Sequence, residues 1–143
     1  MKSQQKIESK EAKIAERYIE ASGGRKTASA RARLYTKGSG LTVNGSDYKD
    51  YFRAEKHRAA AIAPFELMKV GETMRASVKV VGGGINAQAE AVRNAIAKAL
   101  AKFNQDFKKR LRRAGFITRD SRAVERKKYG LKKARRAPQW QKR

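Results

Sequence analysis

The chain contains no cysteine and only one histidine, His57, among its 143 residues. Disulfides, thiolate nucleophiles and cysteine-ligated zinc are therefore excluded, and a chain without cysteine fits a reducing compartment. A lone histidine with no second histidine beside it is also a poor basis for a metal site. Because no acidic pair has a His or Lys arrangement that indicates a reaction, we expect no catalytic residue, no metal and no cofactor.

Long apolar runs are also missing. No run approaches the roughly 18 residues that a membrane-spanning helix needs, and the first residues lack the apolar stretch of a signal peptide. Four glutamates within the first 20 residues argue against an organelle transit peptide, which is poor in acids. We expect a cytoplasmic protein that does not contact a membrane.

Acidic residues are scarce beside the basic ones. The chain has 13 Asp and Glu against 36 Lys and Arg, a formal net charge of +23. Self-repulsion of this size disfavours a compact state unless a polyanion neutralises it, so nucleic acid is the leading candidate partner. The charge is uneven, because residues 107–143 hold 16 basic and 2 acidic side chains, a net charge of +14.

The length and an apolar content of 40% are enough for one small core. We predict an N-terminal extension over residues 1–16, helical or disordered, and a globular α/β RNA-binding domain over 17–103. A basic amphipathic connector follows over 104–117. Residues 118–143 form an extended tail, because their apolar residues are too sparse to offset the entropy of ordering.

Alternation with a period of two predicts the strands. In TASARARLY, residues 27–35, small apolar residues alternate with Ser, Arg and Tyr, as on a half-buried strand. Residues 74–80 show the same pattern. LTVNG, residues 41–45, predicts a short strand that enters a turn, since Asn and Gly tolerate positive φ.

Two segments have helical patterns. Residues 57–68 are alanine-rich, and we expect a helix that breaks or restarts at Pro64. Apolar residues from Ile85 to Phe103 recur at steps of three and four and predict one amphipathic helix. Gly82 to Gly84 precede it, and because they match neither common phosphate-loop pattern, a tight strand-to-helix connection is favoured over a nucleotide site.

Several charged clusters have both a functional and a structural interpretation. Arg31 and Arg33 share one side of a strand, and no acidic residue between Arg25 and Tyr35 can pair with them; either the face is simply solvated or it binds phosphates. His57 is a surface residue or a phosphate contact. Asp120 and Glu125 are expected to hold neighbouring arginines in place.

The C-terminal segment differs in kind from a flexible tail. Its last seventeen residues, KKYGLKKARRAPQWQKR, contain eight Lys or Arg and no acid. The cations come in pairs separated by groups that include Tyr129, Leu131 and Trp140. This arrangement offers phosphate contacts interleaved with side chains that can stack on bases.

The motifs GRKTASARARL, GGGINAQAEAVRNAIAKAL and GFITRDSRAVERKKYGLKKARRAPQWQKR resemble the bacterial small-subunit ribosomal protein nine family, over about residues 18–143. The resemblance implies a two-layer α/β sandwich like the second domain of small-subunit ribosomal protein five, with a left-handed βαβ crossover that general handedness rules would not predict. It implies a structural constituent of the small ribosomal subunit that contacts ribosomal RNA and neighbouring proteins in the subunit head. The tail is then expected to reach the tRNA in the peptidyl site.

Candidate site residues combine this resemblance with the basic clusters. The tRNA-binding candidates are Gln141, Lys142 and Arg143. The ribosomal-RNA-binding candidates are Arg25, Lys26, Arg31, Arg33, Arg112, Arg113, Arg119, Arg122, Arg126, Lys127, Lys128, Lys132, Lys133, Arg135 and Arg136.

The chain departs from the family pattern at three positions. Ala87 and Ala95 stand where the family usually has Gly, and Gly24 stands where it has a basic residue. The alanines argue against a close approach of RNA or of a strand to that helix, and Gly24 removes one expected phosphate contact. Two alternatives remain: a sequence-independent nucleic-acid packaging protein, and an enzyme related to small-molecule kinases of similar topology, which lacks the expected phosphate loop here.

Overall fold

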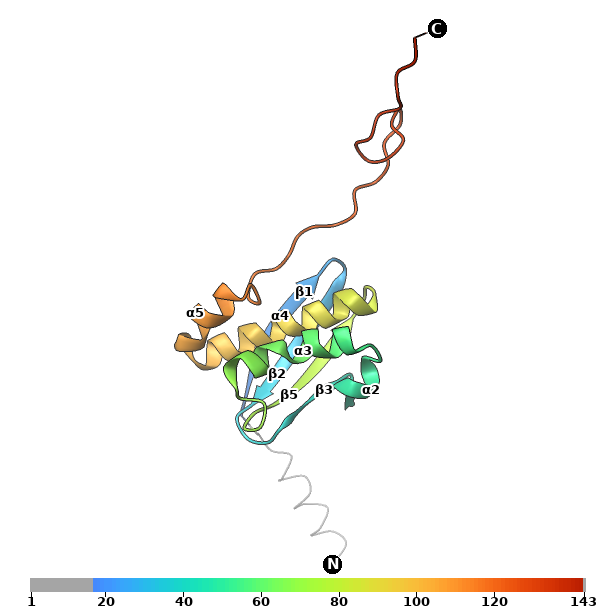
Figure 1. Cartoon of the computed structure of the whole chain (residues 1–143). Coiled ribbons are helices and arrows are strands. Elements are labelled where there is room, and N and C mark those ends of the chain that lie inside the picture. The colour runs from blue at the N-terminus through green and yellow to red at the C-terminus, as the bar shows by residue number, and fades with distance from the viewer. Residues whose placement is uncertain (1–16, 143) are drawn as a thin grey trace, which may run out of the picture.

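The computed structural model describes residues 17–142. The predicted extension over residues 1–16 and the terminal Arg143 lie outside the described residues. In chain order the elements are β1 (Tyr18–Arg25), β2 (Ala28–Tyr35), β3 (Gly40–Val43), β4 (Ser46–Asp47), α2 (Tyr48–Tyr51), α3 (Glu55–Met68), β5 (Arg75–Val81), α4 (Ile85–Phe103) and α5 (Gln105–Arg113). After α5 the chain first stays in contact with the body up to Arg122 and then continues as a tail that leads away from it (Figure 1).

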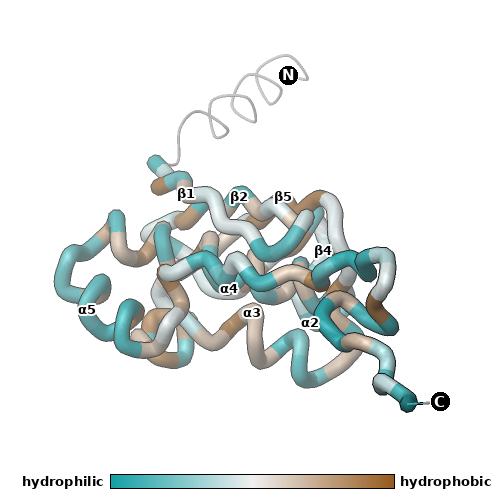
Figure 2. The backbone as a smooth tube through the Cα atoms, turned by 90° about the horizontal axis from the view of Figure 1, so that it is seen from above, coloured by the Kyte–Doolittle hydropathy of each residue, from teal (hydrophilic) through white to brown (hydrophobic). Residues whose placement is uncertain are grey.

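The strands form one mixed sheet with the order β1-β2-β5-β3-β4. Neighbours pair antiparallel except β3 and β5, which are parallel and are joined through α2 and α3. Viewed from above, the central strands form one layer, and α3 and α4 lie beneath them (Figure 2). The predicted α/β class is confirmed.

The predicted strands agree closely with those of the structure. Along β2 the residues alternate between buried and exposed from Ala28 to Leu34, and β5 alternates in the same way. The turn after β3 also forms as predicted, with positive φ at Asn44 (50°) and Gly45 (87°). One face of the sheet therefore packs against helices, while the other presents the polar members of each strand.

Helix α4 spans the predicted residues, but its burial pattern differs from a single stripe. Val92, Ile96 and Leu100 are fully buried, whereas Ile85 and Phe103 at the two ends are exposed. The middle of the helix contacts the sheet on one side and α3 on the other. Burial is therefore wider than predicted in the middle, where both layers cover the helix, and weaker at its ends.

The predicted break at Pro64 is wrong. Helix α3 is continuous through this residue, and it buries Ala61, Pro64, Phe65 and Met68 at helical spacing. An interior proline costs about 3 kcal/mol because it removes a hydrogen bond and crowds the preceding turn. Burial of a helix face that includes Phe65 and Met68 offsets a cost of this size, at about 1.5–3 kcal/mol for each large side chain.

Strand β1 makes an unusually close contact with α4 at Gly23. A Cβ atom added to this residue would lie 2.4 Å from the main-chain nitrogen of Ala95 and 2.6 Å from the carbonyl oxygen of Ala91. Real Cβ atoms do not approach backbone atoms this closely. The small residues on both elements thus set the depth at which the helix lies on the sheet.

The substitution Gly23→Ala should destabilise the fold by about 2 kcal/mol or more, because overpacking against backbone costs roughly 1–3 kcal/mol and exceeds the gain from a stiffer unfolded chain. Urea unfolding followed by circular dichroism measures the change. Gly24→Ala is the matched control and should cost less stability, because its added Cβ would come no closer than 3.3 Å to a neighbouring atom, the carbonyl oxygen of Ala28. Equal losses in the two variants would contradict the packing argument.

Candidate nucleic-acid interface

The face of the sheet opposite the helices is basic. Pairing of β2 with β5 places Arg31 directly opposite Lys79 and Arg33 opposite Ser77, all on the exposed side. With neighbouring backbone they line a shallow hollow of about 520 Å³. The two predicted site residues of β2 are thus brought together with Lys79, which was not among the candidates although its strand shows the same alternation.

An acidic partner for these arginines comes from the neighbouring strand. Glu20 of β1 lies 3.0 Å from Nε of Arg31 and 3.7 Å from Nε of Arg33. No acidic residue lies between Arg25 and Tyr35, but strand pairing supplies a carboxylate from outside that interval, so the two arginines are not unpaired in the fold. Exposed pairs of this kind contribute about 0–1 kcal/mol, and one carboxylate faces two guanidinium groups, so the face keeps a positive balance.

Aromatic rings flank the same face. The guanidinium carbon of Arg33 lies 5.0 Å from the ring centre of Tyr18, and that of Arg75 lies 4.7 Å from the ring centre of Tyr35. The two tyrosine rings are 5.9 Å apart. Sequence inspection missed Tyr18 and Arg75 as part of the site, because only strand pairing brings these residues to one edge.

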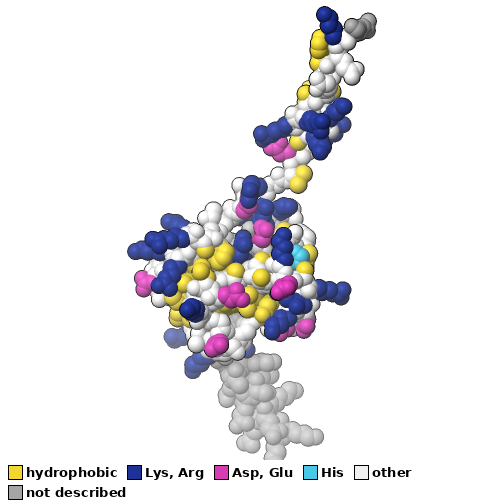
Figure 3. All heavy atoms as spheres, viewed as in Figure 1, with side chains coloured by type: hydrophobic (Ala, Val, Ile, Leu, Met, Phe, Trp, Pro, Cys, Tyr) yellow, Lys and Arg dark blue, Asp and Glu magenta, His cyan; other side chains and the backbone are white. Residues whose placement is uncertain are grey.

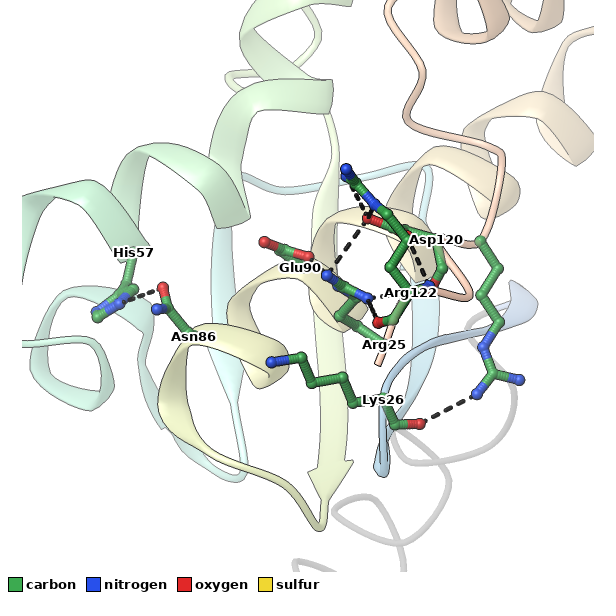
Figure 4. A network of polar contacts seen from close by, with 8 residues as sticks. Arg25, Lys26, His57, Asn86, Glu90, Asp120 and Arg122 are labelled. Atoms are coloured by element: carbon green, nitrogen blue, oxygen red, sulfur yellow. Dashed lines mark hydrogen bonds and ion pairs between the residues drawn. The ribbon is translucent and has the colours of Figure 1, made fainter. Parts of the chain in front are cut away.

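Arg25 and Lys26 occupy the hairpin between β1 and β2, and Arg25 is turned toward the protein (Figure 4). The Arg25 guanidinium donates through Nε to Glu90 at 2.7 Å and approaches the Asp120 carboxylate at 3.3 Å. It also donates to the carbonyl oxygens of Asp120 and Arg122. Its side chain is only 14% exposed, so this ribosomal-RNA candidate has protein partners in the free chain.

The predicted connector forms helix α5, whose cations face solvent. Leu111 is fully buried and ties the helix to the core, while Arg112 and Arg113 are exposed. Asn104 caps the helix by accepting a hydrogen bond from the main-chain N–H of Asp106 at 2.9 Å. The hydrophilic colouring of α5 in Figure 2 reflects this run of cations.

The two tail acids pair locally with arginines, as the sequence predicted. Glu125 accepts two hydrogen bonds from Arg135, at 2.6 and 2.9 Å, and lies 3.9 Å from Lys128. The main-chain N–H of Lys132 donates to the Arg136 carbonyl at 2.7 Å. These contacts fold the middle of the tail into a loop around Gly130, whose φ is +75°.

Most tail cations keep their charge free for a partner. No carboxylate of the described chain lies within ion-pair distance of the exposed Arg126, Lys127, Lys132, Lys133, Arg136 or Lys142. Tyr129 and Trp140 are exposed as well. Figure 3 shows Lys and Arg gathered in groups along the tail with apolar side chains between them. Gln141 and Lys142 lie exposed at its end, and the candidate Arg143 is outside the described residues.

Comparison with known proteins decides the family. The family model described as ribosomal protein S9/S16 matches residues 23–143. The small ribosomal subunit protein uS9 of Desulfovibrio desulfuricans is 42% identical over 91% of this chain and all of its own length. The uS9 proteins of Cytophaga hutchinsonii and Thermus thermophilus are 45% and 44% identical, over 87% and 85% of this chain and 98% and 94% of their own lengths.

The chain belongs to the ribosomal protein S9/S16 family. Its members are structural, non-enzymatic proteins, and membership makes the chain a constituent of the small ribosomal subunit, with ribosomal RNA and other ribosomal proteins as partners. The family match therefore favours the ribosomal interpretation over the packaging and kinase-type alternatives.

The three departures from the family pattern can now be placed. Ala95 does permit a close strand approach, because Gly23 of β1 supplies the missing space. Ala87 is buried on α4. Gly24 lies beside the Arg119 side chain, since a Cβ atom added to Gly24 would be 3.5 Å from Nε of Arg119. Arg119 also donates a hydrogen bond to the Lys26 carbonyl oxygen at 3.1 Å. A basic residue at Gly24 would therefore adjoin the base of the tail.

His57 has a structural partner in the fold. His57 shares a hydrogen bond of 2.9 Å with Asn86, which links the start of α3 to the start of α4 (Figure 4). Within residues 17–142, no three His, Asp or Glu side chains are grouped in a way that could hold a metal ion. No helix in this part of the chain is both long and apolar enough to cross a membrane.

Asp120 has the clearest electrostatic perturbation. Hydrogen bonds from the Arg122 side chain, at 2.8–3.1 Å, and from the Arg122 main-chain N–H, at 2.9 Å, stabilise the ionised carboxylate. These bonds, together with the charges of Arg122 and Arg25, hold the pKa of Asp120 well below its ordinary value of 3.8. The same pair raises the pKa of Arg122.

Since its pKa is lowered in the folded state, Asp120 contributes stability that is complete above pH 3.8 and is lost as the pH falls through the lowered pKa. In Arg122→Gln the pKa of Asp120 should rise toward its ordinary value. NMR titration of the Asp120 side-chain carboxyl carbon measures the pKa in each protein. Arg126→Gln is the control and should leave the pKa of Asp120 unchanged; an ordinary pKa in the unaltered protein would refute the assignment.

Proposed function

We propose that the protein binds ribosomal RNA through two surfaces, and that the end of its tail contacts the tRNA in the peptidyl site. The first surface is the open face of the sheet, around Arg31, Arg33 and Lys79. The second is the basic segment formed by α5 and residues 119–142. The resemblance to the small-subunit protein nine family supports the second surface and the tRNA contact, whereas the first surface is supported by the clustering of Arg31, Arg33 and Lys79 on one face of the sheet.

The observation that carries this proposal is the composition of the exposed tail. Residues 123–142 contain one carboxylate, Glu125, and its two closest cations are Arg135 and Lys128. The other cations have no internal carboxylate partner, within the described chain, that would compete with phosphate. Phosphate contacts position a protein on RNA, and exposed aromatic side chains such as Tyr129 and Trp140 can stack on unpaired bases.

The fold-level part of the resemblance is also a proposal. We infer that the body is like the second domain of small-subunit ribosomal protein five and that the parallel pair β3 and β5 is joined by a left-handed crossover. The parallel pairing of β3 with β5, separated in sequence by α2 and α3, supplies the βαβ unit that this proposal requires.

Binding to ribosomal RNA should weaken steeply with salt, because each neutralised phosphate releases counterions and contributes a slope of about 0.9 for duplex or 0.7 for single strands in log affinity against log salt. Arg31→Gln/Lys79→Gln should lower both the affinity and the slope. The matched control Lys56→Gln/Lys69→Gln removes two exposed lysines from α3 and its C-terminal cap, and should change both less. Filter binding across a salt series measures the slopes, and equal effects of the two double variants would contradict a role for the sheet face.

Removal of Gln141 to Arg143 should weaken retention of tRNA in the peptidyl site and leave incorporation into the small subunit intact, because the body and upstream tail make the ribosomal RNA contacts. Lys142→Gln/Arg143→Gln keeps the length and should reproduce the defect, while Gln139→Ala, at an exposed glutamine outside the candidate set, should not. Dissociation of tRNA from purified subunits and sedimentation of the tagged protein give the two readouts. A truncation that blocks incorporation would show that the division of roles is wrong.

A further inference from the structure

The segment between α5 and the free tail runs along the body and is held there. Asn94 of α4, 4% exposed, donates from Nδ2 to the carbonyl oxygens of Phe116 and Ile117, both at 2.8 Å. The guanidinium carbon of Arg93 lies 5.1 Å from the centre of the Phe116 ring. Residues 116–117 are therefore attached to helix α4 through their main chain, which is a contact independent of RNA.

Arg25 holds the next part of the same segment. Its guanidinium lies between the carboxylates of Glu90 and Asp120 and also donates to the Arg122 carbonyl at 2.6 Å. A guanidinium has five N–H donors in a rigid planar fork, so one side chain can join a helix, a carboxylate and a main chain. The group comes from the end of β1, so it links the sheet, α4 and the tail base at one point (Figure 4).

The contacts with the body end at Arg122. Within the described chain, the hydrogen bonds and ion pairs of residues 123–142 stay inside the tail. Val124, just beyond the attachment, is 91% exposed. The boundary between attached and free chain therefore falls directly after the residue whose carbonyl Arg25 binds.

We propose that Arg25 is a positioning residue that docks residues 118–122 on the body and so fixes the direction in which the tail leaves it. Asn94 and Arg119 assist, through the contacts with Phe116 and Ile117 and with the Lys26 carbonyl. Arg25 then acts on RNA binding through the tail, since its donors are directed to Glu90, Asp120 and the main chain. That this docking favours contact with tRNA rests on the proposed function, whereas the docking of residues 118–122 on the body does not depend on it.

Docking at this point matters because of the length of chain beyond it. Residues 123–142 can extend to roughly 65 Å at about 3.3 Å per residue. A pivot at residue 118 or earlier, with free backbone torsions, spreads the tail tip over a larger volume than a fixed exit does, and this lowers its effective concentration at a distant site. A fixed exit direction therefore favours simultaneous engagement of the body and the tail.

Because the chain has no cysteine, spin labels can be placed without background. Ser121→Cys places one label in the docked segment, and Ser39→Cys places another in the exposed loop before β3. Double electron–electron resonance on the free protein, without RNA, measures the distance distribution between them. We expect a single narrow distribution in the otherwise unaltered chain and its loss, with broadening, in Arg25→Lys and Arg25→Gln.

Arg25→Lys is the decisive variant because it keeps the positive charge that a phosphate contact would need, but has no planar fork to join three partners. Arg31→Lys, an arginine paired with Glu20 on the sheet face, is the matched control and should leave the distribution narrow. Narrow distributions in both Arg25 variants would overturn the proposal. If the Arg25 variants do not fold, Asp120→Asn decides: broadening supports the docking, and an unchanged width overturns it.

A second measurement separates this proposal from the proposed function. In purified small subunits, Arg25→Lys should speed dissociation of peptidyl-site tRNA in the same direction as removal of Gln141 to Arg143. If the truncation leaves tRNA unaffected while the Arg25 variants still broaden the distance distribution, the tRNA contact fails and the docking stands. If the truncation acts but the distribution stays narrow in the Arg25 variants, the docking fails alone.

Discussion

The close contact between β1 and α4 at Gly23 is the constraint on which the rest of the molecule depends. The helix can lie this near the strand only because Gly23 meets Ala91 and Ala95. Its depth and rotation then decide where its outward side chains stand. Glu90 and Asn94 lie one turn apart on α4. Asn94 binds the segment that leads into the tail, and Glu90 binds Arg25, which in turn holds that segment. A packing contact between small residues thus sets the starting point of the basic tail.

Charge is divided between shaping the protein and binding its partner. Asp120 and Glu125, the two acids after residue 106, each bind an arginine and give the tail a local form at its base and in its middle. Glu20 has the same role on the sheet face. Because so few carboxylates are present, most of the remaining tail cations are not neutralised within the described chain and stay available to an anionic partner.

Several features could be predicted from the sequence because they depend on local patterns. Alternation along β2 and β5 reports one buried face, and the apolar spacing from Ile85 to Phe103 reports a helix whose bounds the structure reproduces. The break at Pro64 was predicted by the same local logic and was wrong. The proline costs about 3 kcal/mol locally. Burial of the α3 face against the neighbouring helix α4 outweighs this cost, and the local sequence pattern does not contain that contact.

By itself, the sequence determined the α/β class, the excess of positive charge and the exposed cationic and aromatic tail, since each follows from composition or from spacing within a few residues. Only the tertiary structure decided which cations are already engaged. Arg25 meets Glu90 from 65 positions away and Asp120 from 95 positions away. Such pairs depend on the depth of a helix on a sheet and on the path of a loop, so equally basic residues in the sequence receive different partners in space.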